Sequence, residues 1–203
     1  MVVEIIIGLL IGYLLGSVNP AILLSKIKGK DIRELGSGNA GATNTLRNYG
    51  KGAALTVTCL DILKCVIAIL LSQMAANLLG IDVLTSKVFA GVGCILGHNY
   101  PLYFGFKGGK GVLVSVTAIF MLDYRVGLIA ILTFIIVFAL SRYVSLGSVS
   151  GAAAAIISSA ILSSAEVKIF CIFAGILAIL RHKTNIERLR AGTESKTTFK
   201  SNK

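Results

Sequence analysis

Residues 97–111, GHNYPLYFGFKGGKG, lie between two apolar runs and contain five glycines, one proline, one histidine and two lysines. So many helix-breaking and charged residues between two apolar segments predict a loop with a function of its own. The glycines at its end permit the backbone to turn consecutive N–H groups toward one point. Lys107 and Lys110 add positive charge beside those groups. The stretch therefore predicts a site for phosphate or another small anion.

A plain cytoplasmic turn with positively charged flanks is the alternative interpretation of the same lysines. The stretch is not a Walker A phosphate loop, because Lys110 is followed by Gly111 instead of Ser or Thr and the G-x-x-x-x-G-K spacing is missing. Both interpretations place the loop at a membrane surface.

The composition indicates a membrane protein. Of the 203 residues 55% are hydrophobic and 14% are charged, and the mean hydropathy is +0.85, which excludes an ordinary soluble domain. In a membrane protein the net charge of +11 indicates cytoplasmic loops and anionic partners rather than nucleic acid. The four cysteines fall in apolar runs without C-x-x-C spacing, and there are two histidines. We therefore expect no disulfide, no metal site and no cofactor.

The apolar runs predict an all-α membrane protein, a single domain over residues 1–203 with about seven transmembrane helices, some of them short. The expected spans are residues 2–24, 52–79, 88–96, 112–122, 126–140, 146–162 and 167–180. Gly8, Gly12 and Gly16 recur every four residues, so the first helix has a face that another helix can approach closely. Ser17, Asn19 and Pro20 loosen the end of that helix.

The positive-inside rule predicts the orientation of the chain. Most of the 20 Lys and Arg residues fall in the polar segments 26–51, 97–111 and 181–203. The opposite side would carry Lys87, Arg125 and Lys168. We therefore expect the N-terminus outside, and the glycine loops and the C-terminus on one cytoplasmic surface.

The first polar segment contains a second glycine-rich stretch, GSGNAGATN at residues 36–44, followed by Arg47. Its short donors and acceptors are unlike a solvated linker and predict a ligand loop that runs into a helix N-terminus near Ala42. The alternative is that Ser37 and Thr43 are helix caps. The polar tail, from Arg181 onward, adds His182, Asn185 and a Glu194–Lys196 pair, which are either site residues or ordinary interfacial and tail groups.

Asp61 and Lys64 lie three residues apart inside the expected second span, so they can pair on one helical face. Ionisable residues within a membrane indicate function by default, but a structural ion pair fits equally well. A cationic, amide-rich surface suits a doubly charged phosphate ester. No Ser-His-Asp order and no metal motif is present, so classical hydrolase and metal-dependent chemistry are disfavoured.

Three motifs together resemble the acyl-phosphate-dependent glycerol-3-phosphate acyltransferases, the PlsY family. They are GSGNAGATN (36–44), GHNYP with FKGGKG (97–111), and RHKTNIERL with GTESK (181–196). The resemblance covers nearly the whole chain in order, and Arg142 to Ser145 also fits the family's helix junction. One departure lies at Val18–Asn19–Pro20, where many members place Pro directly after Ser-Ile.

The resemblance implies an enzyme of phospholipid biosynthesis in the bacterial inner membrane. It would move a fatty acyl group from acyl phosphate to the 1-hydroxyl of glycerol 3-phosphate and form lysophosphatidic acid. The lipid bilayer and, transiently, the soluble enzyme that makes acyl phosphate would be its partners, and nucleic acid would not. The expected catalytic residues are His182, Lys107 and Asn185. The residues expected to bind the phosphates are Ser37, Asn39, Thr43, Asn44, Arg47, His98, Gly108, Gly109, Lys110, Glu194 and Lys196.

The general base is either a histidine, with His182 favoured over His98, or a phosphate of the substrate, which titrates near pH ~6. Backbone N–H groups of the Gly108–Gly111 turn are expected to stabilise the developing oxyanion. A transporter of a phosphorylated solute is the rival class, but the sequence has no visible internal repeat and no polar path across the bilayer. A lipid-binding scaffold would explain the cations but not the separate glycine loops.

Overall fold

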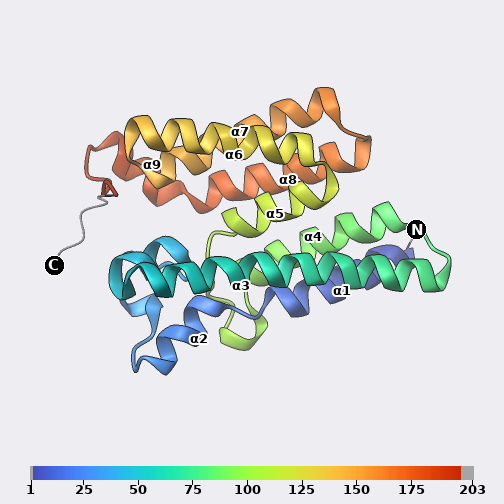
Figure 1. Ribbon diagram of the computed structural model, residues 1–203, viewed down its shortest axis with the longest axis horizontal. Helices are drawn as coiled ribbons and strands as arrows, with labels where there is room; N and C mark the ends of the chain where they lie inside the picture. Colours follow the sequence, from blue (N-terminus) through green and yellow to red (C-terminus); the bar gives the residue numbers. More distant parts are fainter. Residues whose placement is uncertain (1, 198–203) are drawn as a thin grey trace. The chain divides into compact units, whose positions relative to one another are not determined.

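The computed structural model describes residues 2–197 and is helical throughout its regular elements. The chain divides into two compact units; the first ends at Leu122 and the second begins at Asp123. The first unit holds α1 (Val2–Gly16), α2 (Pro20–Ile27), η1 (Ile32–Glu34), α3 (Ala42–Leu79), α4 (Val83–Asn99), η2 (Leu102–Phe104) and α5 (Val112–Leu122). The second holds α6 (Tyr124–Ser141), α7 (Val144–Leu162), α8 (Ala165–Arg181) and α9 (Lys183–Arg190) (Figure 1).

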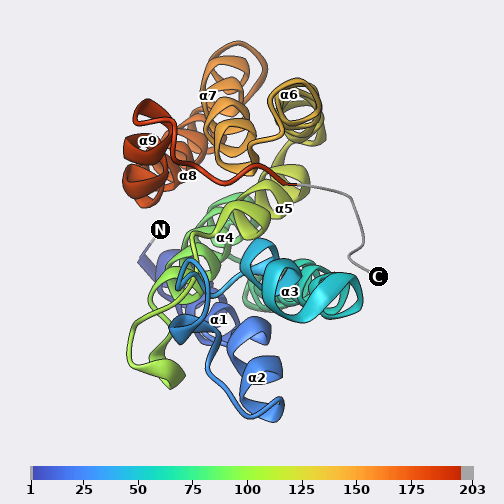
Figure 2. The same ribbon diagram turned by 90° about the vertical axis from the view of Figure 1, so that its left-hand side faces the viewer.

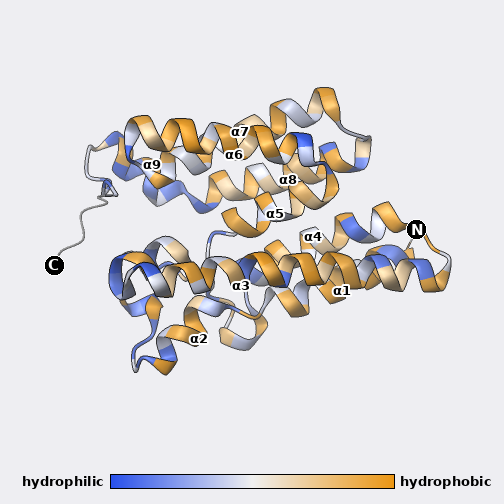
Figure 3. Cartoon of the chain, viewed as in Figure 1, coloured by the Kyte–Doolittle hydropathy of each residue, from blue (hydrophilic) through white to orange (hydrophobic). Residues whose placement is uncertain are grey.

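Four helical stretches among the described residues are long and apolar enough to cross a membrane: Val2–Ile27, Ala42–Leu79, Tyr124–Ser141 and Val144–Leu162. Apolar residues cover these helices in both units, and hydrophilic residues gather at the first turns of α3 and in the tail (Figure 3). The prediction of an all-helical membrane protein is confirmed. That residues 1–203 form one domain stays a prediction.

The first expected span is interrupted. α1 ends at Gly16, and α2 begins at Pro20, whose missing N–H and fixed φ suit the first turn of a helix. Asn19 caps α2, because its Oδ1 accepts the Ile22 N–H at 3.1 Å. The predicted loosening at Ser17 to Pro20 is therefore a complete break followed by a short second helix.

The glycines of α1 form a close-packing face, as predicted, and α4 is the helix that packs against it. A Cβ at Gly12 would overlap the Ala90 carbonyl, and one at Gly16 would overlap the Cys94 carbonyl. α4 contributes Gly93 and Gly97 to the same contact, where Cβ atoms would overlap the α1 backbone. Backbones can approach this closely only where side chains are absent. Figure 2 shows α1 and α4 side by side, with α3 next to them.

α3 begins at Ala42, where the sequence predicted a helix N-terminus, and reaches Leu79. It is kinked at Gly50, which has φ 82° and ψ −178°. A residue other than glycine would be strained in that backbone conformation. The eight residues before the kink thus form a separate helical segment between the first polar loop and the membrane-length part of α3.

In the second unit α7 packs against both α6 and α8, and α9 packs on α7 and α8. The turn into α6 is fastened by Asp123, which accepts hydrogen bonds from the Arg125 side chain at 3.0 and 2.9 Å and from Ser163 at 2.7 Å. The hydrogen bonds from Arg125 and, to a smaller extent, from Ser163 lower the pKa of Asp123 to about 2. Burial of the carboxylate opposes this shift but does not cancel it. α9 was not predicted, because the tail from Arg181 onward was interpreted only as polar.

Candidate active site

The first glycine-rich loop of the sequence is held by the side chain of Asn44, which is 1% exposed. Its Oδ1 accepts the Ser37 N–H at 3.1 Å, and its Nδ2 donates to the carbonyls of Ile32 at 3.1 Å and Leu35 at 2.9 Å. The amide is thus used to fold the loop back on the start of α3. These contacts give Asn44 a role in the support of the loop. That it also binds phosphate stays a prediction.

Other residues of the loop are more accessible. Ser37 is exposed, and Asn39 and Thr43 are partly buried. The N-cap of α3 is Gly41, which makes no side-chain capping bond. Ser37 and Thr43 are therefore not the caps of this helix, and the alternative interpretation of these two residues is wrong.

The second glycine-rich loop folds onto the end of α4. The Gly108 N–H donates to the Asn99 carbonyl at 3.2 Å, and the Gly109 N–H donates to the His98 carbonyl at 3.1 Å. These two donors are occupied. Two of the N–H groups of the Gly108–Gly111 turn are thus used within the loop. That this turn, with a lysine, stabilises the developing oxyanion stays a prediction.

Gly109 lies where the two glycine loops meet within the first unit. A Cβ at this position would overlap Nε2 of the His98 ring and would lie 2.7 Å from the Ala40 carbonyl oxygen. Ala40 itself is fully buried, and its carbonyl also accepts a hydrogen bond from Asn19 at 3.4 Å. The missing side chain of Gly109 is what lets the loops approach each other.

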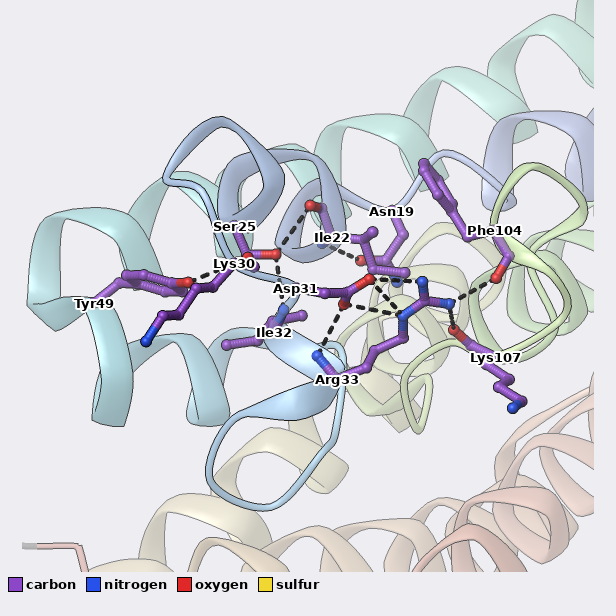
Figure 4. Close-up of polar contacts among 10 residues, drawn as sticks. All are labelled: Asn19, Ile22, Ser25, Lys30, Asp31, Ile32, Arg33, Tyr49, Phe104 and Lys107. Carbon is purple, nitrogen blue, oxygen red and sulfur yellow. Dashed lines mark hydrogen bonds and ion pairs between the residues drawn. The ribbon is translucent and has the colours of Figure 1, made fainter.

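A second link between the loops comes from Arg33, which the sequence analysis did not select. Its guanidinium forms a fork on Asp31, with distances of 2.7 to 3.1 Å, and NH1 donates to the carbonyls of Phe104 at 2.7 Å and Lys107 at 3.2 Å (Figure 4). The hydrogen bond from Arg33 lowers the pKa of Asp31 below its ordinary value, against a smaller opposing effect of burial. Arg33 therefore fixes the backbone from which the Lys107 side chain projects.

The apolar support of this region is a cluster of fully buried side chains contributed by α2, η1, the first loop and α3: Ala21, Ile22, Ile32, Ala40 and Val57. Ser25 connects two parts of it, because its hydroxyl donates to the Ile22 carbonyl at 3.0 Å and accepts the Ile32 N–H at 2.9 Å (Figure 4). Buried polar groups with partners on both sides add rigidity to the platform under the loop.

The cations predicted to bind phosphate remain near the surface of the first unit. Arg47 and Lys107 are exposed, and Lys110 is partly buried. Arg47 projects from the helical segment that precedes the Gly50 kink. Lys107 and Lys110 thus stand on the second glycine loop, and Arg47 stands on the first helical segment of α3, which follows the first glycine loop.

His98, in contrast, lies in the last turn of α4 with 6% of its side chain exposed. Its Nδ1 is 3.1 Å from the Lys64 Nζ and 3.3 Å from Asp61 Oδ1, and Lys64 is 2.8 Å from the same carboxylate oxygen. The predicted pair of Asp61 and Lys64 is present, and it includes a histidine from the adjacent helix.

In the second unit Glu194 is the centre of a polar cluster. Its Oε1 accepts hydrogen bonds from Ser145 at 2.7 Å and Asn185 at 2.6 Å, and its Oε2 accepts one from Arg188 at 2.7 Å. Burial acts to raise the pKa of Glu194, but the hydrogen bonds from Arg188, Asn185 and Ser145 together hold it below the ordinary value. Glu194 is 6% exposed as a side chain, so it is not a solvated tail charge.

His182 lies at the junction of α8 and α9 and is 3% exposed. Its Nδ1 is 2.7 Å from the Ala178 carbonyl oxygen. A carbonyl oxygen accepts only, so Nδ1 carries a hydrogen, and in the neutral ring Nε2 is the nitrogen with the lone pair. Lys196 lies 5.5 Å from the centre of the Tyr143 ring, a cation–π contact that fixes the tail against the start of α7.

The predicted site residues of the first unit are Ser37, Asn39, Thr43, Asn44, Arg47, His98, Lys107, Gly108, Gly109 and Lys110, and those of the second are His182, Asn185, Glu194 and Lys196. Sequence reasoning missed Arg33 and Ser145. Ser145 ends the stretch from Arg142 that fits the family's helix junction, but it was not selected as a site residue. The sequence gave no signal for the link made by Arg33, because the two carbonyls that it joins to the first loop lie 71 and 74 residues away.

Comparisons with known proteins point to one family. The family model described as glycerol-3-phosphate acyltransferase matches residues 6–192. The glycerol-3-phosphate acyltransferase of Thermoanaerobacter pseudethanolicus is 43% identical over 92% of both chains, and that of Shouchella clausii is 45% identical over 97% of both.

Solved structures of a relative agree as well. The crystal structure of PlsY (YgiH), an integral membrane glycerol 3-phosphate acyltransferase, in its glycerol 3-phosphate form matches with a TM-score of 0.86 and 37% identity over 96% of both chains. Its lysophosphatidic acid form matches with a TM-score of 0.83, 36% identity, and 96% and 95% coverage. The family model and the relatives span nearly the whole chain, so this chain belongs to the glycerol-3-phosphate acyltransferase family.

Proposed function

We propose that the protein transfers a fatty acyl group from acyl phosphate to the 1-hydroxyl of sn-glycerol 3-phosphate. The products are lysophosphatidic acid and inorganic phosphate. The observation that carries this proposal is the joined pair of glycine loops, with Lys107 and Lys110 on the second loop and Arg47 on the helix that follows the first. Both substrates carry a phosphate, so their approach requires positive charge that offsets the repulsion between them. The crystal forms of the relative, one with glycerol 3-phosphate and one with lysophosphatidic acid, support the acceptor and the product.

The chemistry needs no covalent acyl-enzyme, because acyl phosphate is already an activated mixed anhydride. The 1-hydroxyl oxygen attacks the carbonyl carbon and forms the ester C–O bond. The C–O bond to phosphate breaks, and phosphate leaves with that electron pair. Orientation of the two substrates then supplies much of the rate, on the order of 7–11 kcal/mol at best. Lys107 and Lys110 bind and neutralise the phosphates.

The hydroxyl proton goes to a general base. His182 supports this role, because the Ala178 carbonyl holds the hydrogen on Nδ1 and leaves the lone pair on Nε2. Asn185 and Glu194 hold the start of α9 beside it. A substrate phosphate, with its pKa near ~6, is the second candidate. A His182→Ala enzyme that kept most of its kcat would assign the proton to the substrate.

We also propose the orientation that the positive-inside rule favours, with about seven spans, the N-terminus outside the membrane, and the glycine loops and C-terminus in the cytoplasm. The helices α4, α5 and α8 have 17, 11 and 17 residues. They would then cross the bilayer with the help of flanking polar residues, or cross only part of it. A cytoplasmic site would also receive acyl phosphate from the soluble enzyme that makes it.

The experiment that tests the donor uses purified protein in detergent or bilayers. Labelled glycerol 3-phosphate is mixed in separate tubes with palmitoyl phosphate, palmitoyl-CoA or palmitoyl acyl carrier protein. We expect lysophosphatidic acid from palmitoyl phosphate alone. Product from a thioester donor would contradict the proposed donor. No product in any tube, beside an active relative as control, would overturn the proposed reaction and favour a transport function.

A further inference from the structure

The cluster of Asp61, Lys64 and His98 is unusual because all three groups can carry charge and all are enclosed. Their side chains are 3%, 7% and 6% exposed, and α3 belongs to the apolar stretches long enough to cross a membrane. Charges at such positions are costly unless each is paired. Each hydrogen of the Lys64 ammonium is therefore expected to have an acceptor within the fold.

Lys64 connects α3 to the break between α1 and α2 and to α4. Its Nζ donates to the carbonyls of Val18 at 2.8 Å and Gly16 at 3.1 Å. Both carbonyls lie at the break between α1 and α2, where a helix end leaves acceptors without their usual N–H partners. The ammonium supplies the donors that this backbone lacks.

The His98 Nδ1 lies where it can accept the third hydrogen of the ammonium. An ammonium has three hydrogens, and the acceptors with hydrogen-bond geometry are the Gly16 and Val18 carbonyls and the His98 Nδ1, the last at 3.1 Å. A hydrogen on Nδ1 would point at the lysine instead of accepting from it. A doubly protonated ring would also place a second positive charge 3.1 Å from the ammonium.

Asp61 supplies the counter-charge. Its Oδ1 is 2.8 Å from Lys64 Nζ and 3.3 Å from His98 Nδ1. The carboxylate therefore stabilises the ammonium inside the unit. It is also the acceptor to which Nδ1 would turn if the lysine were removed.

We propose that Lys64 and Asp61 are positioning residues that hold His98 as the neutral tautomer with its hydrogen on Nε2. Nε2 is the nitrogen that faces Gly109 and the Ala40 carbonyl, where the glycine loops meet. His98 thus presents a fixed N–H donor at this junction and does not serve as a base. The use of that donor toward a substrate phosphate rests on the proposed function, whereas the tautomer does not.

The same rule gives the opposite result for His182, whose Nδ1 donates to the Ala178 carbonyl. The two histidines of the sequence are therefore expected to be opposite tautomers, one with the hydrogen on Nε2 and one with it on Nδ1. One spectrum can test both assignments, because the ring nitrogens of a neutral histidine differ strongly in chemical shift when one is protonated and the other is not.

The experiment is a long-range ¹H–¹⁵N correlation spectrum of the full chain labelled with ¹⁵N-histidine, in micelles at a pH above the ordinary histidine pKa of about 6.5. A His182→Gln variant assigns the two rings. We expect His98 to show an unprotonated, hydrogen-bonded Nδ1 and a protonated Nε2. A protonated Nδ1 of His98 in the unaltered protein would overturn the proposal, and this result needs no variant of the cluster.

Lys64→Met then tests the role of the lysine, because methionine keeps the unbranched apolar stem and removes the donor. We expect His98 Nδ1 to become protonated and to turn toward Asp61. Lys87→Met, on the same helix as His98, is the matched control and should leave the spectrum unchanged. If Nδ1 stays unprotonated in Lys64→Met, Lys64 does not set the tautomer and the proposal fails.

If Lys64→Met does not fold, the Asp61→Asn/Lys64→Met double variant removes both charges together and avoids an unpaired buried carboxylate. Loss of the Nε2–H tautomer of His98 there supports the proposal, and its retention overturns it. An inactive wild-type enzyme with the expected spectrum would contradict the proposed function and leave the tautomer assignment intact.

Discussion

The close contact at Gly109 allows a prediction with a magnitude. In Gly109→Ala the new methyl group would overlap His98 Nε2 and would lie 2.7 Å from the Ala40 carbonyl, whereas ordinary contact begins at 3.4 Å. The backbone φ of Gly109 is outside the left-handed region, so the effect is steric. The two glycine loops would have to separate by roughly 0.7 Å or more, the difference between those two distances.

Overpacking of this kind costs typically about 1–3 kcal/mol of stability. A displacement of ~1 Å at a site that orients two substrates costs on the order of 10²-fold in rate. We therefore expect Gly109→Ala to lower kcat/KM for glycerol 3-phosphate about 10²-fold, with a lower Tm. The assay is lysophosphatidic acid formation from palmitoyl phosphate, combined with a thermal melt in the same detergent.

Gly52→Ala is the matched control. Gly52 lies in α3, and a Cβ there would meet no atom within 4 Å. Alanine in a helix is favoured over glycine by roughly 0.5–1 kcal/mol, so this variant should keep its activity and melt at the same temperature or higher. Wild-type activity and Tm in Gly109→Ala would refute the argument that the two loops depend on this contact.

Three further variants test separate parts of the structure. Arg33→Lys keeps the charge but cannot both form the fork on its carboxylate partner and reach the Lys107 carbonyl. Because the lost hydrogen bonds are worth about 0.5–1.5 kcal/mol each, kcat/KM should fall about tenfold. An unchanged kcat/KM would contradict a role of Arg33 in placing the second loop. Glu194→Gln turns one acceptor of the cluster into a donor that faces another donor, so the free energy of unfolding should fall by about 2 kcal/mol, with a lower Tm and lower activity. A Tm equal to that of the wild type would argue against Glu194 as the centre of the cluster. The pKa of Asp123 is about 2 in the folded protein, below the ordinary value of 3.8, so its stabilising contribution is complete above pH ~4 and is lost as the pH falls through about 2. The Tm of Asp123→Asn should therefore be lower than that of the wild type at neutral pH and should fall less in that acid range, and identical pH profiles would show that the carboxylate contributes nothing.

Local signals in the sequence were sufficient for several elements. The apolar run 112–122 coincides with α5, and the small polar residues before Ala42 placed the start of α3 correctly. The four-residue spacing of Gly8, Gly12 and Gly16 predicted close packing, because such spacing places the glycines on one helical face. These features depend on neighbours within a turn or two of the helix.

Elements that depend on distant contacts were not predictable. α4 continues to Asn99, beyond the expected end at residue 96, because polar side chains at its end are buried in the fold. α9 has a strongly polar sequence and is held by the cluster around Glu194, for which the sequence left open a site residue or a tail charge. Asn44 has a side chain that suits ligand binding, but its amide forms hydrogen bonds to the backbone of the loop. The sequence identified the segments, and long-range hydrogen bonds decide the role of each side chain.

The proposed reaction predicts which bond of acyl phosphate breaks, and a labelled donor measures this directly. Palmitoyl phosphate with ¹⁸O in the bridging position is incubated with the purified protein and glycerol 3-phosphate, and both products are analysed by mass spectrometry. Attack at the carbonyl carbon predicts one phosphate for each lysophosphatidic acid, with the label in the phosphate. Label retained in free palmitate, or phosphate release without lysophosphatidic acid, would contradict direct acyl transfer.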